Sequence, residues 1–428
     1  MADNTASFVR NQLIPESPPP SSETGAIKWV RENLFSSPLN IFMTVVSLWA
    51  IYSLIINVAP WFINGVWSGS SVRDCYEVLD GATGACFAVL KERWPQLIYG
   101  FKYPASEFWR PNLAAILLCI AIAPVLFRTV SRKLFFFTLI YPFLAFWLVW
   151  GGTILTSIVA FAGFLVALFS FRKLEYHGFV IALIGGCAAA LVCWILGGYL
   201  IDLGENFVAL PAVPSRDMGG FMLNLILGTV CVSLSLPLGI VLALGRQSNM
   251  PIIKWICVFF IEFIRGVPLI TLLFVANVVL AYFFPPDTNI DLILRVIIMI
   301  TLFSAAYIAE VIRGGLAALP SGQYEAANSL GLDYAQSMRL IILPQALRVS
   351  IPGIVNVAVG LFKDTTLVSI ISMFDLIGMI RGPILASTAW SGVYWELFAF
   401  AAMIFFIVCY SISQYSQWLE RQLETDHR

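Results

Sequence analysis

Long apolar stretches separated by short polar segments are the feature that most constrains this chain. A helix needs about 20 apolar residues to cross the hydrocarbon core of a bilayer. Ten segments of roughly that kind follow one another: Ile41–Pro60, Asn112–Phe127, Leu134–Trp150, Thr153–Phe171, Gly178–Leu200, Phe221–Leu244, Trp255–Phe283, Leu292–Ile312, Ile351–Ile371 and Tyr394–Gln414. The third and fourth meet at Gly151 and Gly152 in a tight hairpin, so we expect eight to ten spans. The sequence therefore predicts an all-α polytopic membrane protein.

Composition excludes several other classes of protein. Hydrophobic residues make up 59% of the chain and charged residues 12%, whereas soluble domains carry roughly 25% charged residues. A net charge of zero argues against a nucleic-acid partner. No nucleotide-binding GxxxxGK[ST] loop and no nucleophile–base set is visible, and only two histidines occur. We therefore expect no enzyme activity, no metal site and no cofactor in this chain.

The first 37 residues differ from the rest. Residues 1–23 are polar and rich in proline and serine, which is typical of a disordered tail. In residues 24–37, Ile27, Val30 and Leu34 fall on one helical face. Lys28 and Arg31 fall on the opposite face. This segment predicts either an amphipathic helix on the membrane surface or a continuation of the tail.

The positions of lysine and arginine predict the orientation in the membrane, because short cytoplasmic loops carry an excess of both. The short loops on the side of the N-terminus carry Arg128, Arg132, Lys133, Arg172, Lys173, Arg246, Lys254, Arg313, Arg339, Arg348 and Arg421. The short loops on the other side carry only Arg216 and Arg381. Both termini are therefore expected in the cytoplasm of a bacterial cell, with a multi-pass chain in the inner membrane.

Two of the eight cysteines stand outside the apolar stretches. Cys75 and Cys86 lie in the long loop 61–111 on the expected outer side, where the bacterial periplasm oxidises thiols. A disulfide that closes so short a loop could contribute about 3 kcal/mol. The alternative is two free thiols.

A polar segment between the eighth and ninth apolar stretches, residues 320–345, carries an ordered pattern. Its members are Glu325, Ala326, Ala327, Gly331, Ile341, Leu343 and Pro344. The pattern predicts a short helix over Gln323–Leu330, a sharp turn at Gly331 and a second helix that ends at proline. We expect a folded knob on the membrane surface.

One face of that first helix is expected to contact a partner protein. Its projecting side chains would be Tyr324, Ala327 and Leu330 or Leu332. The small Ala326 and Ala327 would let a groove close on the helix, and Glu325 would offer a charge to a basic residue of the partner.

The spacing of residues 320–345 resembles the EAA loop of the membrane subunits of ATP-binding-cassette importers. Other segments resemble the polar-amino-acid branch of that family, the histidine and glutamine type. They are Glu262–Leu269, Ala306–Gly315, Leu343–Arg348 and Lys363–Leu367. Thr366 stands where serine is common in that branch. The long first half departs from the common five-span plan, and this arrangement is similar to the large permease subunits of general L-amino-acid importers.

The resemblance implies a division of the chain. Residues 1–37 would be a cytoplasmic tail with a possible amphipathic helix. Residues 38–218 would form an extension of about five spans with a periplasmic loop at 61–111. Residues 219–428 would form the five-helix core of a type I importer permease, with its EAA loop at 320–345.

The resemblance also implies a function. The chain would be the permease subunit that translocates L-amino acids across the inner membrane. Its partners would be an ABC ATPase dimer docked on the EAA loop, a second permease subunit that is a paralogue or another copy, and a periplasmic amino-acid-binding protein. Membrane lipid would surround it.

Charged residues inside the apolar stretches are candidates for the pathway or its gate, because each costs about 3 kcal/mol near the bilayer centre. They are Glu262, Arg265, Glu310, Arg313, Lys363 and Asp364. The first four form two pairs at spacing i, i+3, which can close on one helical face. Structural ion pairs and substrate contacts both remain open for them, whereas the adjacent Lys363 and Asp364 need other partners.

Pro268 interrupts the seventh apolar stretch, and Gly266 beside it weakens the helix further. Discontinuous helices tend to line translocation paths, although a static kink is an alternative. A secondary, ion-coupled transporter of about ten spans is the competing function. Such a protein is expected to show paired broken helices in two repeats, and this sequence shows one clear break.

Overall fold

The computed structural model describes residues 25–127, 129–204, 207–279, 282 and 291–425. The tail predicted over residues 1–23 lies outside these ranges, and so do Arg128 and His427. The chain divides into two compact units. One comprises residues 1–66 and 76–85, and the other comprises residues 67–75 and 86–428.

The first unit contains α1 (Gly25–Asn33) and α2 (Pro38–Ile63). α1 falls within the segment for which the sequence predicts an amphipathic helix. α2 begins cleanly because Ser37 caps it, accepting a hydrogen bond from the Asn40 amide at 3.2 Å, and proline suits the first helical position. None of the residues of α2 is buried, as expected for a single span whose neighbour is lipid.

The N-terminal part of the second unit consists of short outer helices, two antiparallel helix pairs and a minimal sheet. The boundary between the two units runs through α3 (Val72–Leu79). The helices that follow are α4 (Ala88–Glu92), α5 (Trp94–Tyr99), α6 (Trp109–Leu126), α7 (Phe135–Trp150), α8 (Ile154–Leu174) and α9 (Phe179–Leu203). Three single-turn 3₁₀ segments lie between them: η2 (Ala105–Glu107), η3 (Arg132–Leu134) and η4 (Glu175–His177). Strand β1 (Gly152–Thr153) pairs antiparallel with β2 (Ala209–Leu210). Gly151 and Gly152 both have positive φ, which permits the hairpin expected there.

Arg110 ties this region together from inside. Its side chain is fully buried at the start of α6. Its Nε donates to the Leu148 carbonyl at 2.6 Å and its Nη1 to the Pro211 carbonyl at 2.9 Å. One guanidinium thereby joins α6, the end of α7 and the segment that leads into the C-terminal half. Because a buried charge needs partners, this clamp fixes where the extension meets the rest of the unit.

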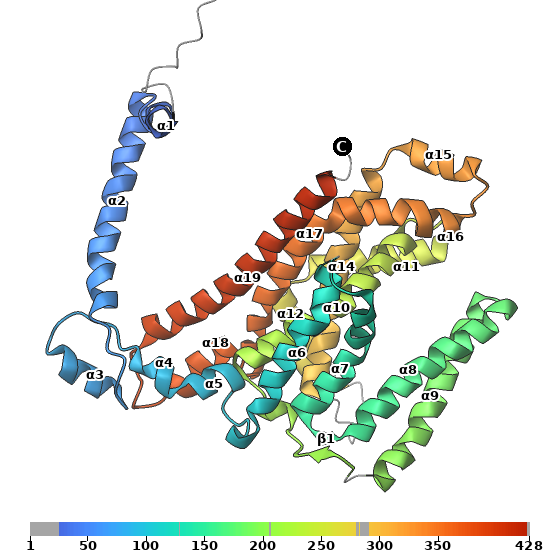
Figure 1. The fold of residues 1–428 in the computed structure, drawn as a ribbon, viewed down its shortest axis with the longest axis horizontal. Coiled ribbons are helices and arrows are strands. Elements are labelled where there is room, and N and C mark those ends of the chain that lie inside the picture. The colour runs from blue at the N-terminus through green and yellow to red at the C-terminus, as the bar shows by residue number, and fades with distance from the viewer. Residues whose placement is uncertain (1–24, 128, 205–206, 280–281, 283–290, 426–428) are drawn as a thin grey trace, which may run out of the picture. The chain divides into compact units, whose positions relative to one another are not determined.

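The C-terminal half is a helical bundle. Its long elements are α10 (Gly220–Arg246), α11 (Pro251–Gly266), α14 (Leu292–Ala317), α17 (Leu343–Asp364) and α19 (Tyr394–Thr425). Its short elements are η5 (Ser215–Asp217), α12 (Leu269–Phe274), η6 (Val275–Val279), α15 (Ser321–Ser329), α16 (Tyr334–Ser337), η7 (Met338–Ile342), η8 (Thr365–Ile371), α18 (Leu376–Met379) and η9 (Ile380–Ile384). Figure 1 shows α14 between α10 and α17.

Glycines allow these central helices to approach closely. A side chain at Gly239 of α10 would collide with Ile308 of α14, and one at Gly315 of α14 would collide with Ser350 of α17 and the Ala346 carbonyl. Small residues at helix contacts are the usual means of close packing in membranes. α14 therefore packs closely against α10 on one side and against α17 on another.

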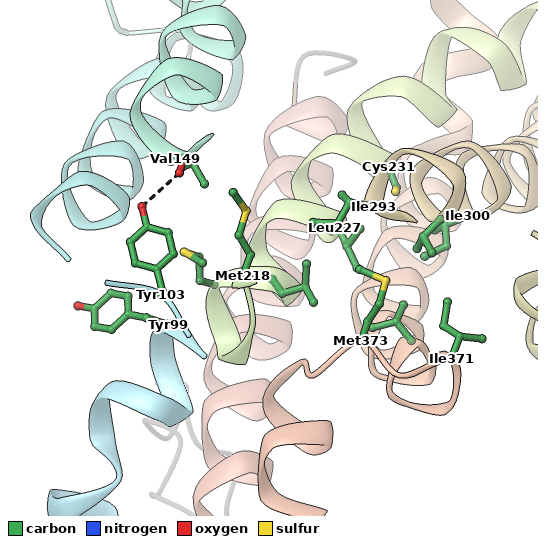
Figure 2. Packing of buried hydrophobic residues seen from close by; sticks show 14 of the residues in the cluster. Tyr99, Tyr103, Val149, Met218, Leu227, Cys231, Ile293, Ile300, Ile371 and Met373 are labelled. Atoms are coloured by element: carbon green, nitrogen blue, oxygen red, sulfur yellow. Dashed lines mark hydrogen bonds between the residues drawn. The ribbon is translucent and has the colours of Figure 1, made fainter. Parts of the chain in front are cut away.

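A large hydrophobic cluster joins the extension to the bundle. Tyr99, Tyr103 and Val149 of the extension share it with Leu227 and Met373 of the C-terminal half, as Figure 2 shows. The Tyr103 hydroxyl also donates to the Val149 carbonyl at 3.2 Å. The two halves of the sequence therefore share one core within this unit.

Among the described residues, nine helices are long and apolar enough to span a membrane, and α11 with α12 makes a tenth candidate. This count agrees with the eight to ten expected. The seventh predicted span, however, is not one helix. α11 ends at Gly266, α12 starts at Leu269, and the two are bent by 102°, because Pro268 and its neighbours break the backbone hydrogen-bond ladder.

Candidate functional site

The segment 320–345 forms two short helices joined by a glycine turn. α15 ends where Gly331 adopts a φ of +74°. The Gly331 amide donates to the Asn328 carbonyl at 2.9 Å, and the Leu332 amide donates to the Ala327 carbonyl at 3.3 Å. Asp333 then caps α16 in a capping box with Gln336. The four backbone amides from Leu330 to Asp333 therefore all have hydrogen-bond acceptors, which defines the turn.

The orientation of α15 differs from the sequence expectation in one respect. Ala327 is fully buried, so it packs inside the loop and offers no surface to a partner. Glu325 and Ala326 are exposed, as is Leu330 at 73%. Helix phase explains the difference, since three successive residues at 100° steps cannot share a face.

Pro344 also differs from the expectation. It does not end the second helix but lies in the first turn of α17, and α16, η7 and α17 follow one another without a break. The preceding turn η7 is a π-helix. Proline has no backbone N–H and so cannot donate the usual α-helical hydrogen bond. The wider π turn before it, with hydrogen bonds between residues five apart, accommodates this missing donor.

The loop is anchored in the bundle. Met338 and Ile342 of η7 are buried in a hydrophobic cluster with Ile308 and Ile312 of α14, and the predicted Ile341 packs against this cluster. Leu343 is half-buried beside them. Gln345 of α17 donates to the Gln323 side chain of α15 at 3.0 Å, so a displacement of the loop would move helices on both sides of it.

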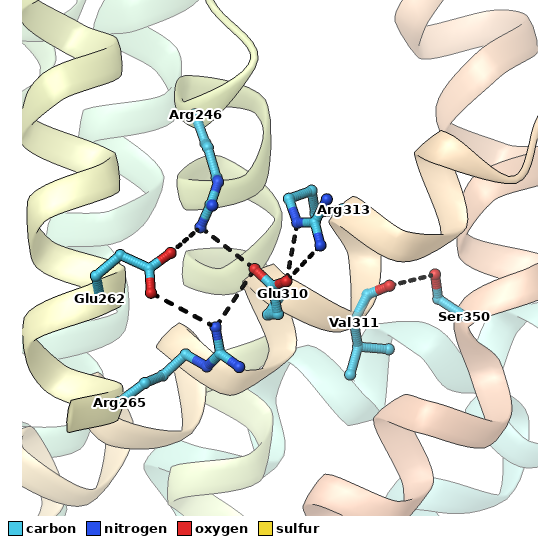
Figure 3. A network of polar contacts seen from close by, with 7 residues as sticks. All are labelled: Arg246, Glu262, Arg265, Glu310, Val311, Arg313 and Ser350. Atoms are coloured by element: carbon cyan, nitrogen blue, oxygen red, sulfur yellow. Dashed lines mark hydrogen bonds and ion pairs between the residues drawn. The ribbon is translucent and has the colours of Figure 1, made fainter. Parts of the chain in front are cut away.

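A cluster of five charged side chains lies where α10, α11 and α14 meet (Figure 3). Arg313 donates to Glu310 Oε1 through Nε at 2.9 Å and Nη2 at 2.6 Å. Arg246 Nη1 lies 2.8 Å from Glu262 Oε1 and 3.3 Å from Glu310 Oε2. Arg265 Nη1 lies 3.5 Å from Glu310 and 4.0 Å from Glu262. All four charges paired by sequence spacing are brought together.

Arg246 is the member that sequence spacing missed. It stands 64 residues from Glu310, so no local rule could pair the two residues. The available signal was its place two residues after the end of the predicted span Phe221–Leu244. The side chains of the cluster are between 22% and 52% exposed, and single exposed pairs contribute about 0–1 kcal/mol. Each pair by itself therefore contributes little to stability, while the cluster as a whole links α10, α11 and α14.

Lys363 and Asp364 occupy the last two positions of α17. Lys363 is exposed and Asp364 half-buried. Among the residues that the structure describes, neither forms an ion pair with a partner within 4.0 Å. The structure therefore does not bring these two together with the charged cluster.

The next residue, Thr365, belongs to a fully buried polar group. Asn224 of α10 donates to Thr365 Oγ1 at 2.9 Å and to Asp375 Oδ2 at 3.1 Å. Asn224 also accepts from the Leu376 amide at 3.1 Å. One amide side chain thus joins α10, η8 and the start of α18. Sequence reasoning missed this group because it depends on residues 141 and 151 positions apart.

Asp375 is the ionisable member of this group. Burial raises the pKa of its carboxyl to about 6, against the hydrogen bonds from Gly378, Asn224 and Ile377 that favour the charged form. Desolvation is the larger effect because no cation faces the carboxylate among the described residues.

Cys75 and Cys86 are joined by a disulfide, and both are buried. The Cys86 amide donates to Glu396 Oε1 of α19 at 2.9 Å. The Val72 amide donates to the Ala389 carbonyl at 2.8 Å. The disulfide therefore fastens two chain segments that each bind the stretch around the start of α19.

Backbone atoms of loop 61–111 pack directly against backbone atoms at the start of α10. A side chain at Gly100 would lie 2.7 Å from Gly219 atoms, and one at Gly220 would lie 2.6 Å from the Leu97 carbonyl. Elsewhere in the same loop, Asp74 accepts hydrogen bonds from Ser70 and Ser71. These bonds, the Ser71 hydroxyl first, lower the pKa of Asp74 to about 2.

No group of three or more metal-ligating side chains occurs among the described residues. Comparison with known proteins identifies the family. A family model described as binding-protein-dependent transport system inner membrane component matches residues 235–425. The glutamate/glutamine/aspartate/asparagine transport system permease protein of Rhodobacter capsulatus is 50% identical over 431 residues, 99% of each chain. The chain belongs to the family of ATP-binding-cassette importer permeases.

Three further comparisons give the share of this permease that other proteins match. An inner membrane amino-acid ABC transporter permease protein of Escherichia coli K12 is 39% identical over 96% of this chain and 98% of its own. A probable glutamine ABC transporter permease protein of Bacillus subtilis is 32% identical over 47% of this chain but 90% of its own. A crystal structure of an amino acid ABC transporter aligns with a TM-score of 0.43 and 32% identity over 47% of this permease and 92% of that chain. The multi-pass inner-membrane character of the chain agrees with the nine long apolar helices found in the part of the chain that the structure describes.

Proposed function

We propose that this permease carries L-amino acids inward across the membrane and that separate ATPase subunits drive it by moving the EAA loop. The observation that carries the proposal is the geometry of residues 320–345. A polar, exposed helix ends in a glycine turn at Gly331, and the helix after the turn is anchored beside α14 through Met338 and Ile342. Such a part can receive a push from a soluble partner and pass it to the bundle.

The proposed orientation places both termini and the EAA loop in the cytoplasm. Arg246, Arg313 and Arg348 lie at the end of the bundle that carries the loop, and the positive-inside rule assigns that end to the cytoplasm. The disulfide lies at the other end, beside the start of α19, where an oxidising periplasm suits it. The loop 61–111 would then be periplasmic.

The proposed assembly contains two ATPase subunits, a second permease subunit and a periplasmic amino-acid-binding protein. Glu325, Ala326 and Leu330 offer the ATPase an acidic group, a small residue and an apolar side chain on one exposed helix. A second permease is needed because one bundle offers only half of the wall around a path. The binding protein would deliver substrate at the end that carries the disulfide.

Lys363, Asp364 and Pro268 are the proposed pathway or gating residues. Lys363 has no ion-pair partner among the described residues and is exposed at the point where α17 narrows into the 3₁₀ turn η8. An exposed cation of this kind suits the carboxylate of a zwitterion. The charged cluster around Glu310 is instead proposed to hold α10, α11 and α14 in register.

Copurification tests the assembly, and uptake tests the cargo. The tagged permease should bring an ATPase with it from detergent-solubilised membranes. Cells that lack the gene should lose uptake of some labelled amino acids, and the first to measure are glutamate, glutamine, aspartate and asparagine, which the relative from Rhodobacter capsulatus is named for. Glu325→Arg should reduce the copurified ATPase while membrane levels persist, with Gln417→Arg on α19 as a matched control outside the loop. An unchanged ATPase yield in Glu325→Arg, together with uptake that survives ATP depletion, would exclude the proposal.

A further inference from the structure

Helix α11 has three distinct faces. At 100° per residue, five large apolar side chains cluster on one face and are between 54% and 75% exposed. They are Ile252, Trp255, Ile256, Phe259 and Phe263. A second face, with Cys257, Ile261 and Ile264, is buried against the bundle. Lys254 and Arg265 lie on the third face, away from the exposed apolar one.

α11 crosses the end of α10 and does not run back along it. Gly245 is the last residue but one of α10, and a side chain there would meet both Ile253 and Cys257. Arg246, the next residue, reaches Glu262 (Figure 3). The contacts of these two residues thus extend over nine positions of α11, about 14 Å of helix at 1.5 Å per residue. An antiparallel partner would have spread these contacts over several turns of α10.

The bend after α11 also indicates that α11 does not follow the direction of the bundle. α12 starts directly after Pro268 and lies at 102° to α11, so the two cannot both follow the membrane normal. α12 packs with α14, where Leu272 shares a small cluster with Ala306. Ile264 of α11 belongs to the same cluster. The contacts that Gly245 and Arg246 make along nine positions of α11 therefore identify α11 as the part of the bent pair that departs from the bundle direction.

We propose that α11 is an in-plane helix whose exposed apolar face is buried among the acyl chains of the cytoplasmic leaflet, and that the chain starts to cross the membrane only at Pro268. An apolar face with basic residues opposite is the pattern of helices that lie in the membrane interface. Val241 lies one turn before Gly245 on α10 and is 63% exposed, so the helix turn next to the contact with α11 also presents an apolar side chain to lipid. This proposal rests on the proposed function in one respect only, which is that the leaflet around α11 is the cytoplasmic one.

Spin-label depth measurements test the proposal. In a variant that keeps the disulfide but lacks the six free cysteines, Ile252→Cys, Ile256→Cys, Phe259→Cys and Phe263→Cys would each carry a nitroxide label in reconstituted vesicles. The measured quantity is the collision rate with oxygen relative to a water-soluble nickel chelate, which reports depth. We expect oxygen access at all four sites and nearly equal depths. Lys254→Cys is the matched control on the other face, and it should collide mainly with the nickel chelate.

Two results would overturn the proposal. A steady depth gradient of about 16 Å between positions 252 and 263, which 1.5 Å per residue gives for a spanning helix, would make α11 part of a transmembrane span. Little access to either reagent would show that protein, such as a second permease, covers the face. Neither readout depends on transport, so a failure of the proposed function would be recognised separately.

Discussion

Substitution of Gly331 offers the sharpest test of how the EAA loop works. A residue with a side chain at a φ of +74° is disfavoured by roughly 1–2 kcal/mol, and more if it is β-branched. No atom lies within 4 Å of the position that a Cβ would take. The cost of a substitution is therefore conformational and does not come from a collision inside this chain.

This separation allows a graded series. Gly331→Asn should be tolerated because asparagine enters the left-handed region readily. Gly331→Ala should cost about 1 kcal/mol and Gly331→Val about 2 kcal/mol or more, which would reduce the population of the correct turn by roughly 30-fold (1.4 kcal/mol per factor of ten). Uptake should fall in the order glycine, asparagine, alanine, valine.

The assay compares uptake with membrane abundance and ATPase yield. Initial rates of labelled amino-acid uptake are divided by the amount of permease in the membrane, and the copurified ATPase is measured for each variant. If valine and asparagine variants transport equally well, the turn conformation is irrelevant and the reasoning fails. If asparagine abolishes transport as completely as valine does, the position requires absence of a side chain for contact with a partner, and the conformational argument is wrong.

The remaining predictions concern the disulfide and two charged residues. A maleimide that cannot cross the inner membrane should label Cys75 and Cys86 only after reduction, because both sulfurs are bonded; labelling without reductant would contradict the bond, and labelling only from the cytoplasm would contradict the orientation. Lys363→Met should insert and assemble with the ATPase yet fail to couple ATP hydrolysis to uptake, since no partner among the described residues would be left unpaired; full transport would remove Lys363 from the pathway, and loss of the protein from the membrane would favour a structural role. The folded-state pKa of Asp375 is raised to about 6 from an ordinary value of 3.8, so the folded state binds the proton more tightly and stability falls as pH rises from about 4 to about 6, by about 3 kcal/mol in all. The melting temperature of the wild type should therefore rise relative to that of Asp375→Asn as pH is lowered from 7 to 5, and a constant difference would refute this.

Hydropathy located most helices because a membrane crossing demands a fixed length of apolar sequence, and that demand is local. It merged α11 with α12 because both are rich in apolar residues and follow one another almost directly in the sequence. Pro268 marked the break but could not give its angle. The turn at Gly331 was predictable because helices commonly end at a residue in the left-handed conformation, and that residue is usually glycine.

The rest of the candidate site depends on contacts between distant parts of the chain. Glu310 and Arg313 are one helical turn apart and could be paired by spacing, whereas Arg246 reaches the same carboxylate from another helix. Asn224 lies near the start of an apolar run and looks like an ordinary small polar residue. Its role appears only when α18 brings Asp375 to it.

The contact between loop 61–111 and the bundle has an evolutionary consequence. Gly219 and Gly220 lack side chains where the backbone of α5 rests on them, and Glu396 receives an amide from the same loop. The shorter Bacillus subtilis permease matches 47% of this chain over 90% of its own length, so little of that protein remains to correspond to the first half of this chain. Selection on these three positions should therefore be relaxed wherever the extension was never acquired. Their identities should be inherited together with residues 38–218, and this linkage would reveal whether the long architecture arose once or several times.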